Sequence, residues 1–181
     1  MSGIIGANLV AGRSSGQIAA VAAVSSGVSF TEDIAEDESM AMTFTGIPAG
    51  TKEVCIHFLD LSLDSSDNID IQIGDSGGLE TSGYLSEGSS IIQSTFSSLE
   101  STSSFVIKLG SHPARLCGAY ILRLINTSTN KWAGHYVTAG TGAPSLCGGG
   151  GFKALSGELT QLEVQSTNSR DAGAVTISFK G

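Results

Sequence analysis

The chain has 181 residues, of which 40% are hydrophobic and 14% are charged, so it can bury one core of ordinary size but not two. Ser, Thr and Gly together supply 66 residues, whereas Lys and Arg supply only nine, a composition that argues against helical bundles and coiled coils. The net charge of −8 disfavours nucleic acid and anionic membrane surfaces as partners, because an acidic surface repels phosphate groups. We therefore expect a single all-β domain.

Residues 1–39 differ in character from the rest of the chain, because their aliphatic residues follow no steady period. The longest apolar run, residues 18–24, is too short to span a bilayer, and a lone Arg13 ahead of it is only a weak match to a signal peptide. The segment is nevertheless apolar enough to favour burial. We predict that residues 1–39 form an extended arm for assembly or anchoring, held between subunits or against a shell. Its predicted contact residues are Ile4, Ile5, Leu9, Val10, Ile18, Val21 and Val24.

Residues 40–181 show the alternation of apolar and polar residues that is typical of half-buried strands. The first predicted strands cover residues 40–44, 54–59 and 69–73, and the Gly-Ile-Pro-Ala-Gly sequence at 46–50 predicts a turn between the first two. Both faces of the second strand are apolar, which predicts a central position. Asp70 and Gln72 alternate with isoleucines in the third strand, which predicts one solvated face.

Later strands are predicted at residues 105–109, 116–124, 132–136, 162–164 and 175–179. The first two of these are predicted to pair as an antiparallel hairpin. Eight to ten short strands at regular spacing indicate an antiparallel β-sandwich over residues 40–181, with a jelly-roll arrangement as the expected topology.

The string Gly74-Asp75-Ser76-Gly77-Gly78 is similar to the sequence around the nucleophile of chymotrypsin-like proteases. That chemistry would need a histidine to accept the proton of Ser76 and an acid to orient the histidine. His57 is the only histidine that precedes Ser76, and the chain is too short for the two barrels of that fold. We therefore interpret the string as a polar turn in which Asp and Ser cap backbone amides.

No other pattern makes a persuasive catalytic, cofactor or metal site. Residues 148–151 are four glycines without the Gly-Lys-Ser/Thr ending of a phosphate-binding loop, so we interpret them as a loop between strands. Five acids between residues 60 and 75 lack the spacing of a calcium loop, and solvated carboxylates are the simpler interpretation. They are Asp60, Asp64, Asp67, Asp70 and Asp75.

The cysteines and histidines are widely separated. Cys55, Cys117 and Cys147 include no CxxC spacing, so they predict neither a zinc site nor a disulfide framework. Cys55 and Cys117 stand in apolar runs, where a reduced thiol packs as a small hydrophobe. His57, His112 and His135 show no metal-ligand spacing. We expect a protein that is not an enzyme and that needs no cofactor.

Several strings occur in a consistent order between residues 40 and 181. They are FTGIPAGTKEV (44–54), IQIGDSGG (71–78), TSGY (81–84), NKW (130–132), GGGFKALSGELT (149–160) and DAG (171–173). In this order they resemble a domain that recurs in the virion proteins of tailed bacteriophages, such as tail fibres and other structural proteins. The resemblance implies a β-rich virion surface module without catalysis that is usually a homotrimer.

A short arm attached to one domain favours a capsid decoration (cement) protein over a tail fibre, which generally also carries a long shaft. Such a protein adds stability by binding the assembled lattice, where trimers bridge neighbouring capsomers. The expected partners are further copies of the chain and the major capsid protein or other virion proteins. The expected location is the virion, assembled in the bacterial host cytoplasm.

The alternative is a tail fibre or receptor-binding protein that contacts the host surface, including host glycan. Glycan sites usually present an exposed aromatic platform, and this chain has only four Trp and Tyr residues: Tyr84, Tyr120, Trp132 and Tyr136. Trp132 alternates with apolar neighbours, so we expect it in the core. The aromatic supply therefore disfavours this alternative.

Overall fold

The computed structural model describes residues 17–18, 30–32, 39–64, 67–92, 94–109, 115–141 and 145–181. Strands and their connections make up this part of the chain, and it contains no helix that could cross a membrane. The strands are β1 (Gln17–Ile18), β2 (Phe30–Glu32), β3 (Ser39–Thr45), β4 (Glu53–Leu63), β5 (Ile69–Asp75), β6 (Gly78–Leu79), β7 (Tyr84–Ile92), β8 (Thr95–Ser101), β9 (Phe105–Ile107), β10 (Arg115–Asn126), β11 (Lys131–Thr141), β12 (Ser145–Ala154) and β13 (Gln161–Lys180).

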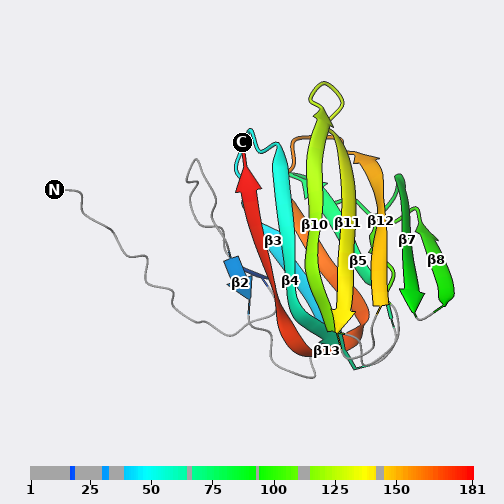
Figure 1. Cartoon of the computed structure of the whole chain (residues 1–181). Coiled ribbons are helices and arrows are strands. Elements are labelled where there is room, and N and C mark those ends of the chain that lie inside the picture. Colours follow the sequence, from blue (N-terminus) through cyan, green and yellow to red (C-terminus); the bar gives the residue numbers. More distant parts are fainter. Residues whose placement is uncertain are drawn as a thin grey trace.

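The strands form two layers that share β13 (Figure 1). The large sheet has the order β2-β13-β4-β10-β11-β12-β7-β8. The small sheet has the order β1-β3-β13-β5, with β6 and β9 both paired to β5. Every pairing is antiparallel except that of β1 with β3. The predicted all-β, antiparallel sandwich class is therefore confirmed, whereas the jelly-roll arrangement stays a prediction.

A single hydrophobic core fills the space between the two layers. The small sheet contributes Met40, Met42 and the isoleucines of β5, and the large sheet contributes Ile56, Tyr120 and Ile177 among others. Outside β5, these residues alternate along their strands with exposed or half-exposed neighbours, because successive side chains of a strand point to opposite faces of the sheet. The alternation in the sequence thus marks the inner face of each layer.

The central position predicted for residues 54–59 is confirmed, because β4 pairs with β10 on one side and with β13 on the other. The turn at residues 46–50 is also found, with Gly46 and Gly50 at φ +73° and +82°. The solvated face predicted for residues 69–73 is wrong. Gln72 is buried and its Nε2 donates to the Ser103 carbonyl over 3.1 Å, because the connection between β8 and β9 covers this face of β5.

The predicted hairpin between residues 105–109 and 116–124 is wrong, because β9 pairs with β5 and β10 pairs with β11. The turn at residues 126–130 joins the actual hairpin. Its conformation is stabilised by Asn126, whose side-chain oxygen accepts hydrogen bonds from the amides of Ser128 and Thr129 at 2.9 and 3.2 Å. Local strand patterns do not determine which strands pair when the partners are distant in sequence.

The last two predicted strands are one continuous strand, β13, whose first half belongs to the small sheet and whose second half belongs to the large sheet. The strand changes sheets through register shifts between Arg170 and Ala174. Gly173 has φ +93°, and an added Cβ would lie 2.4 Å from the Asp60 carbonyl oxygen. The buried Arg170 side chain donates to the Gly173 carbonyl and holds the bulge.

The four glycines at residues 148–151 lie inside strand β12, so their interpretation as a loop is wrong. On the inner face, Gly149 stands in register between Gly88 of β7 and Tyr136 of β11. Tyr136 stacks on Tyr120 with ring centroids 5.5 Å apart, and an added Cβ on Gly149 would lie 2.9 Å from the Tyr136 ring. Gly149 is therefore needed, because a side chain there would meet both the Tyr136 ring and the backbone of the neighbouring strand.

Candidate functional site

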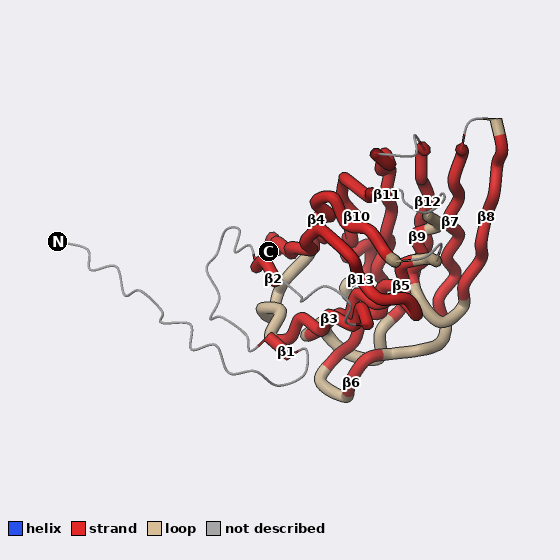
Figure 2. Tube along the Cα trace, turned by 90° about the horizontal axis from the view of Figure 1, so that it is seen from below, coloured by secondary structure: helices blue, strands red, loops and turns tan. Residues whose placement is uncertain are grey.

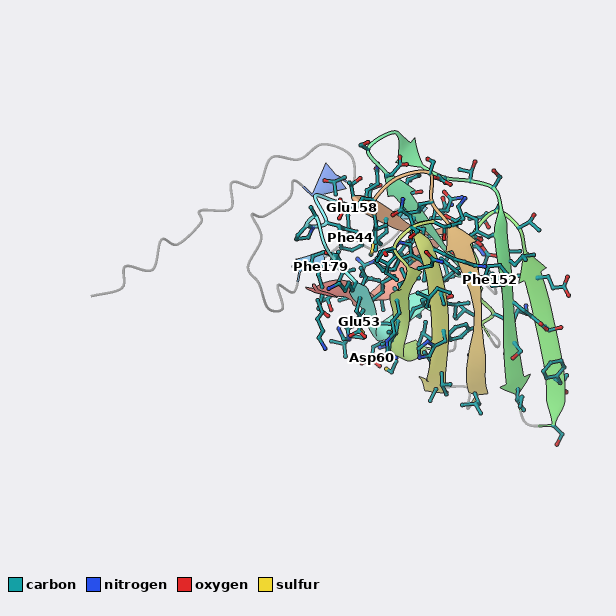
Figure 3. All side chains as sticks on the ribbon, turned by 90° about the horizontal axis from the view of Figure 1, so that it is seen from above. Phe44, Glu53, Asp60, Phe152, Glu158 and Phe179 are labelled. Atoms are coloured by element: carbon teal, nitrogen blue, oxygen red, sulfur yellow. The ribbon has the colours of Figure 1, made fainter. Side chains whose placement is uncertain are left out.

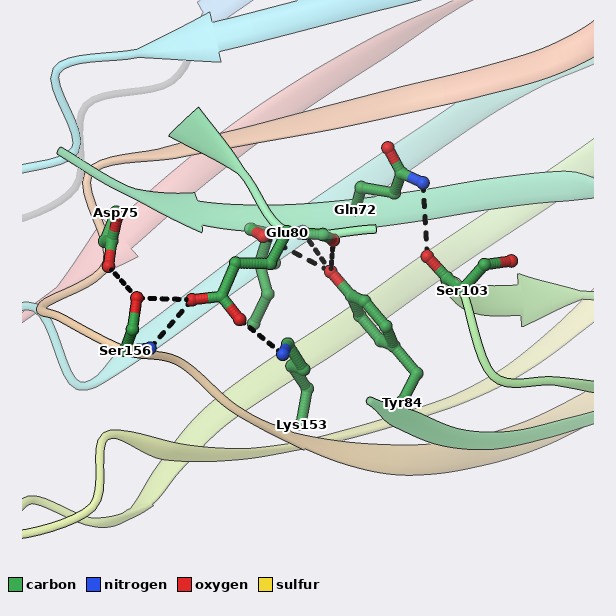
Figure 4. Close-up of polar contacts among 8 residues, drawn as sticks. Gln72, Asp75, Glu80, Tyr84, Ser103, Lys153 and Ser156 are labelled. Carbon is green, nitrogen blue, oxygen red and sulfur yellow. Dashed lines mark hydrogen bonds and ion pairs between the residues drawn. The ribbon is translucent and has the colours of Figure 1, made fainter. Parts of the chain in front are cut away.

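A cluster of polar side chains joins the β5–β6 turn to the loop after β12 (Figure 4). Ser156 lies at its centre, where its hydroxyl lies 2.7 Å from Asp75 Oδ2 and 2.9 Å from Glu80 Oε1. The Ser156 amide also donates to Glu80 Oε1 over 2.7 Å. Lys153 forms an ion pair with Glu80, and its side chain is buried. The cluster connects two loops that are distant in sequence.

Tyr84 lies beneath this cluster and links it to β5 (Figure 4). Its hydroxyl accepts from the Ile73 amide over 2.9 Å and donates to the Glu80 carbonyl over 2.8 Å. The Lys153 ammonium lies 5.3 Å from the centre of the Tyr84 ring, a cation–π distance. Burial raises the pKa of Tyr84, so the phenol stays protonated and acts as a structural donor.

Both carboxylates of the cluster are stabilised in their charged form. The hydrogen bonds from Ser156 and from the Gly77 amide lower the pKa of Asp75. Burial alone would raise the pKa of Glu80, but Lys153 and Ser156 outweigh this effect and lower it. No base accepts the Ser156 proton to activate it as a nucleophile, because its hydrogen-bond partners are carboxylates with lowered pKa values. This arrangement holds two loops together.

Replacing Glu80 by Gln is expected to lower stability by about 1–2 kcal/mol at pH 7, because Lys153 would stay buried without its anion. A lowered folded-state pKa stabilises the fold above the unfolded-state pKa, and this contribution is lost as the pH falls through the folded value. The difference between wild type and Glu80→Gln should therefore shrink between about pH 5 and pH 3. Urea denaturation at both ends of this range measures it, and an unchanged difference contradicts the assignment.

The structure does not assemble the protease constellation. Ser76 lies exposed in the β5–β6 turn of the small sheet. His57 points outward from the large sheet, where its Nε2 lies 3.2 Å from Ser178 Oγ and its Nδ1 lies 3.8 Å from Cys55 Sγ. Asp75 accepts the Gly77 amide over 2.7 Å, as expected for an acid that caps a turn.

The series of acids between residues 60 and 75 does not converge on one point. Asp60 accepts from Cys117 Sγ over 3.1 Å, Asp67 accepts from Ser166 over 2.9 Å, and Asp70 accepts from Ser104. Within the described ranges, no group of three potential metal ligands comes together. The carboxylates of Asp60, Asp67 and Asp70 instead accept hydrogen bonds from three different segments of the chain.

The cysteines differ in burial from the expectation. Cys147 is buried, whereas Cys55 and Cys117 are half-buried. Cys55 stands in register between Ile121 and Ser178 on the outer face of the large sheet, so an apolar run in the sequence does not bury both of its faces. No disulfide joins the three cysteines. Of the histidines, His57 and His135 are exposed, and His112 lies outside the described residues.

Most of the predicted arm lies outside the described residues. Of its predicted contact residues, Ile18 is placed by its backbone in β1, which pairs with β3, and the others are not described: Ile4, Ile5, Leu9, Val10, Val21 and Val24. The short strand β2 pairs with β13. The described parts of residues 1–39 thus pair with strands of both sheets.

The outer face of the large sheet carries large apolar side chains that face solvent. Three of them stand side by side on β8, β7 and β12: Phe96, Ile91 and Leu146, whose exposed fractions are 64%, 45% and 51%. We name these three residues the apolar row. Val137 on β11 is 72% exposed nearby. A contiguous group of exposed apolar residues on a sheet is typical of a protein interaction surface.

Two carboxylates form a second row on the same face. Glu87 of β7 and Glu100 of β8 stand directly opposite each other and are both exposed; we name them the acidic pair. They line a shallow groove of about 360 Å³ whose apolar wall consists of Leu85 and Phe152. Phe152, labelled in Figure 3, lies under the Lys131 ammonium at 4.2 Å from its ring centre. Like charges in direct cross-strand contact destabilise a sheet, so this pair favours a positively charged partner.

The sequence interpretation missed this surface, because residues 79–104 resemble a Ser/Gly-rich connection. A usable signal was present in β7, where Leu85, Glu87 and Ile91 alternate with the small residues Ser86, Gly88 and Ser90. The larger side chains point outward and the small ones point into the core. The usual strand pattern is thus inverted.

Comparisons of the chain with protein families, with curated proteins and with solved structures find no match.

Proposed function

We propose that this chain is a non-enzymatic structural protein of a tailed-bacteriophage virion. In this proposal it is a capsid decoration protein that binds the assembled shell as a homo-oligomer, with a trimer as the expected state. Its partners are then further copies of itself and the major capsid protein. The sequence resemblance over residues 40–181 suggests the virion, and the surface of the large sheet supports a role in binding.

The observation that carries the proposal is the exposed outer face of the large sheet. Phe96, Ile91, Leu146 and Val137 all expose at least 45% of their surface, and Leu85 and Phe152 are exposed on the same face. Their transfer from water contributes about 25 cal/mol per Å² of buried apolar area. Multivalent binding to a lattice would multiply this contribution by the number of subunits engaged. A rigid apolar sheet face suits binding to a capsid lattice.

The alternative, a tail fibre or receptor-binding protein, finds less support in the same structure. Trp132, Tyr84, Tyr120 and Tyr136 are all buried in the core, so the expectation for Trp132 is confirmed. None of them offers a platform on which a sugar ring could stack. Phe96 and Phe152 are exposed, but they lack the polar edge with which Tyr and Trp usually contact sugars.

The proposal is tested by adding the purified protein to phage capsids that lack it and measuring occupancy by cryo-electron microscopy. Binding at lattice-symmetric positions over the shell is expected, together with a higher disruption temperature of the capsid. Val137→Asp should lower the occupancy, whereas Ile125→Asp, a charge placed at another exposed aliphatic residue near the β10–β11 turn, should not. Attachment only at the tail would favour the receptor-binding alternative, and absence of binding to any virion part would reject a virion role.

A further inference from the structure

We infer that residues 9–13 of one copy pair, as a parallel strand, with the outer edge of β8 in a second copy. The inference deepens the proposed function, because it rests on the homo-oligomer and names the contact that builds it. It requires an accessible strand edge, a complementary side-chain pattern and a reason why the contact joins two copies. The described residues and the sequence supply all three.

The accessible edge belongs to β8. This strand is the last in the order of the large sheet and pairs only with β7 among the described strands. Figure 2 shows it at the side of the molecule with no described segment beyond it. It has seven residues and contains neither proline nor lysine, the residues that often protect an edge from pairing. Its backbone groups on that side can therefore accept another strand.

Two rows of side chains end at this edge. Phe96 is the last member of the apolar row, and Glu100 is the last member of the acidic pair. They lie four residues apart on one face of β8, as Ile91 and Glu87 do on β7. A strand that extends both rows must carry an apolar residue beside Phe96 and a basic residue beside Glu100. Those two residues must also be four positions apart, because alternate residues share a face.

Residues 9–13 have this pattern. Leu9 and Arg13 are four residues apart, and Arg13 is the only basic residue before position 40. With Leu9 beside Phe96, the residue beside Glu100 is Arg13 when the strand runs parallel to β8. The Arg13 guanidinium then offers five donors to Glu100 and Glu87, which removes the repulsion between them. Ala11 would lie beside Ser98, and both side chains are small enough to avoid a steric clash.

Pairing of β8 with β8 of another copy fits less well. A symmetric antiparallel pair centred on Ser98 would place Phe96 of each copy beside Glu100 of the other. That arrangement sets an apolar ring beside a carboxylate and leaves both acidic pairs without a cation. The β8 edge therefore favours a basic segment over the β8 edge of a second copy.

The contact must join two copies, because residues 9–13 cannot reach β8 of their own chain. Residue 17 pairs with β3 at one end of the small sheet, and four residues span at most about 14 Å. In the small sheet, the order β1-β3-β13-β5-β9 places β9 four strand spacings from β1. Because β9 packs over β7 of the large sheet, a strand added beyond β8 would lie two further spacings away. At about 4.8 Å for each spacing this is roughly 29 Å. Figures 1 and 2 likewise place the β2 and β1 ends of the sheets opposite to β8.

The inferred contact is heterologous, because one copy donates the segment and the next donates the edge. Repetition of such a contact produces a closed ring when the rotation between copies allows it and a filament when it does not. A ring of three copies would agree with the expected trimer. Each copy in the ring would contribute one leading segment and one β8 edge.

Charge reversal tests the contact in the full-length chain. Glu100→Lys blocks the acceptor edge and Arg13→Glu blocks the donor segment, and each should raise the dissociation constant of the oligomer at least about tenfold. The double variant Arg13→Glu/Glu100→Lys should recover the assembly, because the reversed pair attracts again. Sedimentation velocity measures the mass, against 18.4 kDa for one chain.

Mixing provides the second measurement. Glu100→Lys retains an intact segment and Arg13→Glu retains an intact edge, and their two reversed charges also attract each other. Their mixture should therefore form assemblies of alternating chains that neither variant forms alone. Asp64→Lys, an exposed acid at the end of β4, is the matched control and should assemble as wild type does. Thermal melting by circular dichroism should confirm that all variants fold. Assembly that is unchanged in both single variants, or no recovery in the double variant, overturns the inference.

The two proposals fail in different ways. If the single variants assemble and decorate capsids as wild type does, the strand contact is wrong and the virion role stands. If wild type assembles through Arg13 and Glu100 but binds no part of a virion, the contact stands and the proposed function is wrong.

Discussion

Ile177→Asp is expected to leave the chain unfolded at room temperature. Ile177 is 1% exposed and lies in β13 between Ile56 of β4 and Phe30 of β2, so its replacement places a carboxylate in an apolar environment without a cation. Such a change costs about 4 kcal/mol or more, which is close to the whole stability of a small domain. Loss of the strand signal in circular dichroism and of a cooperative urea transition measures the effect.

Leu59→Asp is the matched control for this prediction. Leu59 lies on the neighbouring strand β4, opposite Ala174 of β13, and is 65% exposed. The new carboxylate would stay in water, so the free energy of unfolding should change by no more than about 0.5 kcal/mol. Equal destabilisation by the two substitutions would contradict the assignment of inner and outer faces.

Gly149→Ala is expected to lower the free energy of unfolding by about 2–3 kcal/mol. An added Cβ at this position would lie 2.2 Å from the Glu87 carbonyl oxygen and 2.9 Å from the Tyr136 ring. The carbonyl belongs to the backbone of the paired strand β7 and cannot move aside without breaking its pairing. Urea denaturation with an unchanged slope would show that the native state, and not the unfolded state, accounts for the loss.

The neighbouring Gly148→Ala provides the comparison. Its added Cβ would lie 3.6 Å from the nearest heavy atom, the Tyr136 carbonyl oxygen, which is an ordinary contact distance. Its effect should stay within about 0.5 kcal/mol. If both alanine variants lose the same stability, strand propensity and not the stacked tyrosines explains the glycines of β12.

The acidic pair and the buried ion pair illustrate opposite uses of charge. Lys153 and Glu80 lie close together beneath the loop after β12 and stabilise each other. Glu87 and Glu100 lie opposite each other on an exposed surface with the same sign of charge. Charge repulsion on one face, next to the exposed apolar row, is a feature that folding alone does not require. A basic segment bound there would relieve this repulsion.

Much of the strand pattern could be predicted wherever apolar residues alternate with polar ones. The runs at 40–44, 54–59 and 69–73 correspond to β3, β4 and β5. The strands β7, β8 and β12 were missed, because Ser and Gly occupy many of their positions and several of their larger side chains, such as Leu85, Phe96 and Leu146, point outward. Sheets that place tyrosine rings over glycines reverse the pattern on which sequence analysis depends.

The candidate surface was less predictable than the fold. The sequence pointed to residues 1–39 as an assembly segment but gave no hint of a place where it would bind. Phe96 and Ile91 are five residues apart, and Leu146 follows Phe96 by 50 residues. Only the register of β8, β7 and β12 brings them into one row. An acidic pair formed by Glu87 and Glu100 likewise exists only because the β7–β8 hairpin sets them opposite each other.

By itself, the amino-acid sequence determined that this protein is all-β and that the alternating apolar residues of runs such as 40–44 and 54–58 face a shared interior, because strand periodicity is a local property of the chain. It also determined the net charge of −8, because 17 acidic residues outnumber nine basic ones. The tertiary structure alone decided which strands pair, how β13 joins both sheets and which side chains meet on the outer face. Those features depend on contacts between residues distant in sequence, and their free energies are realised only when the whole sandwich has formed.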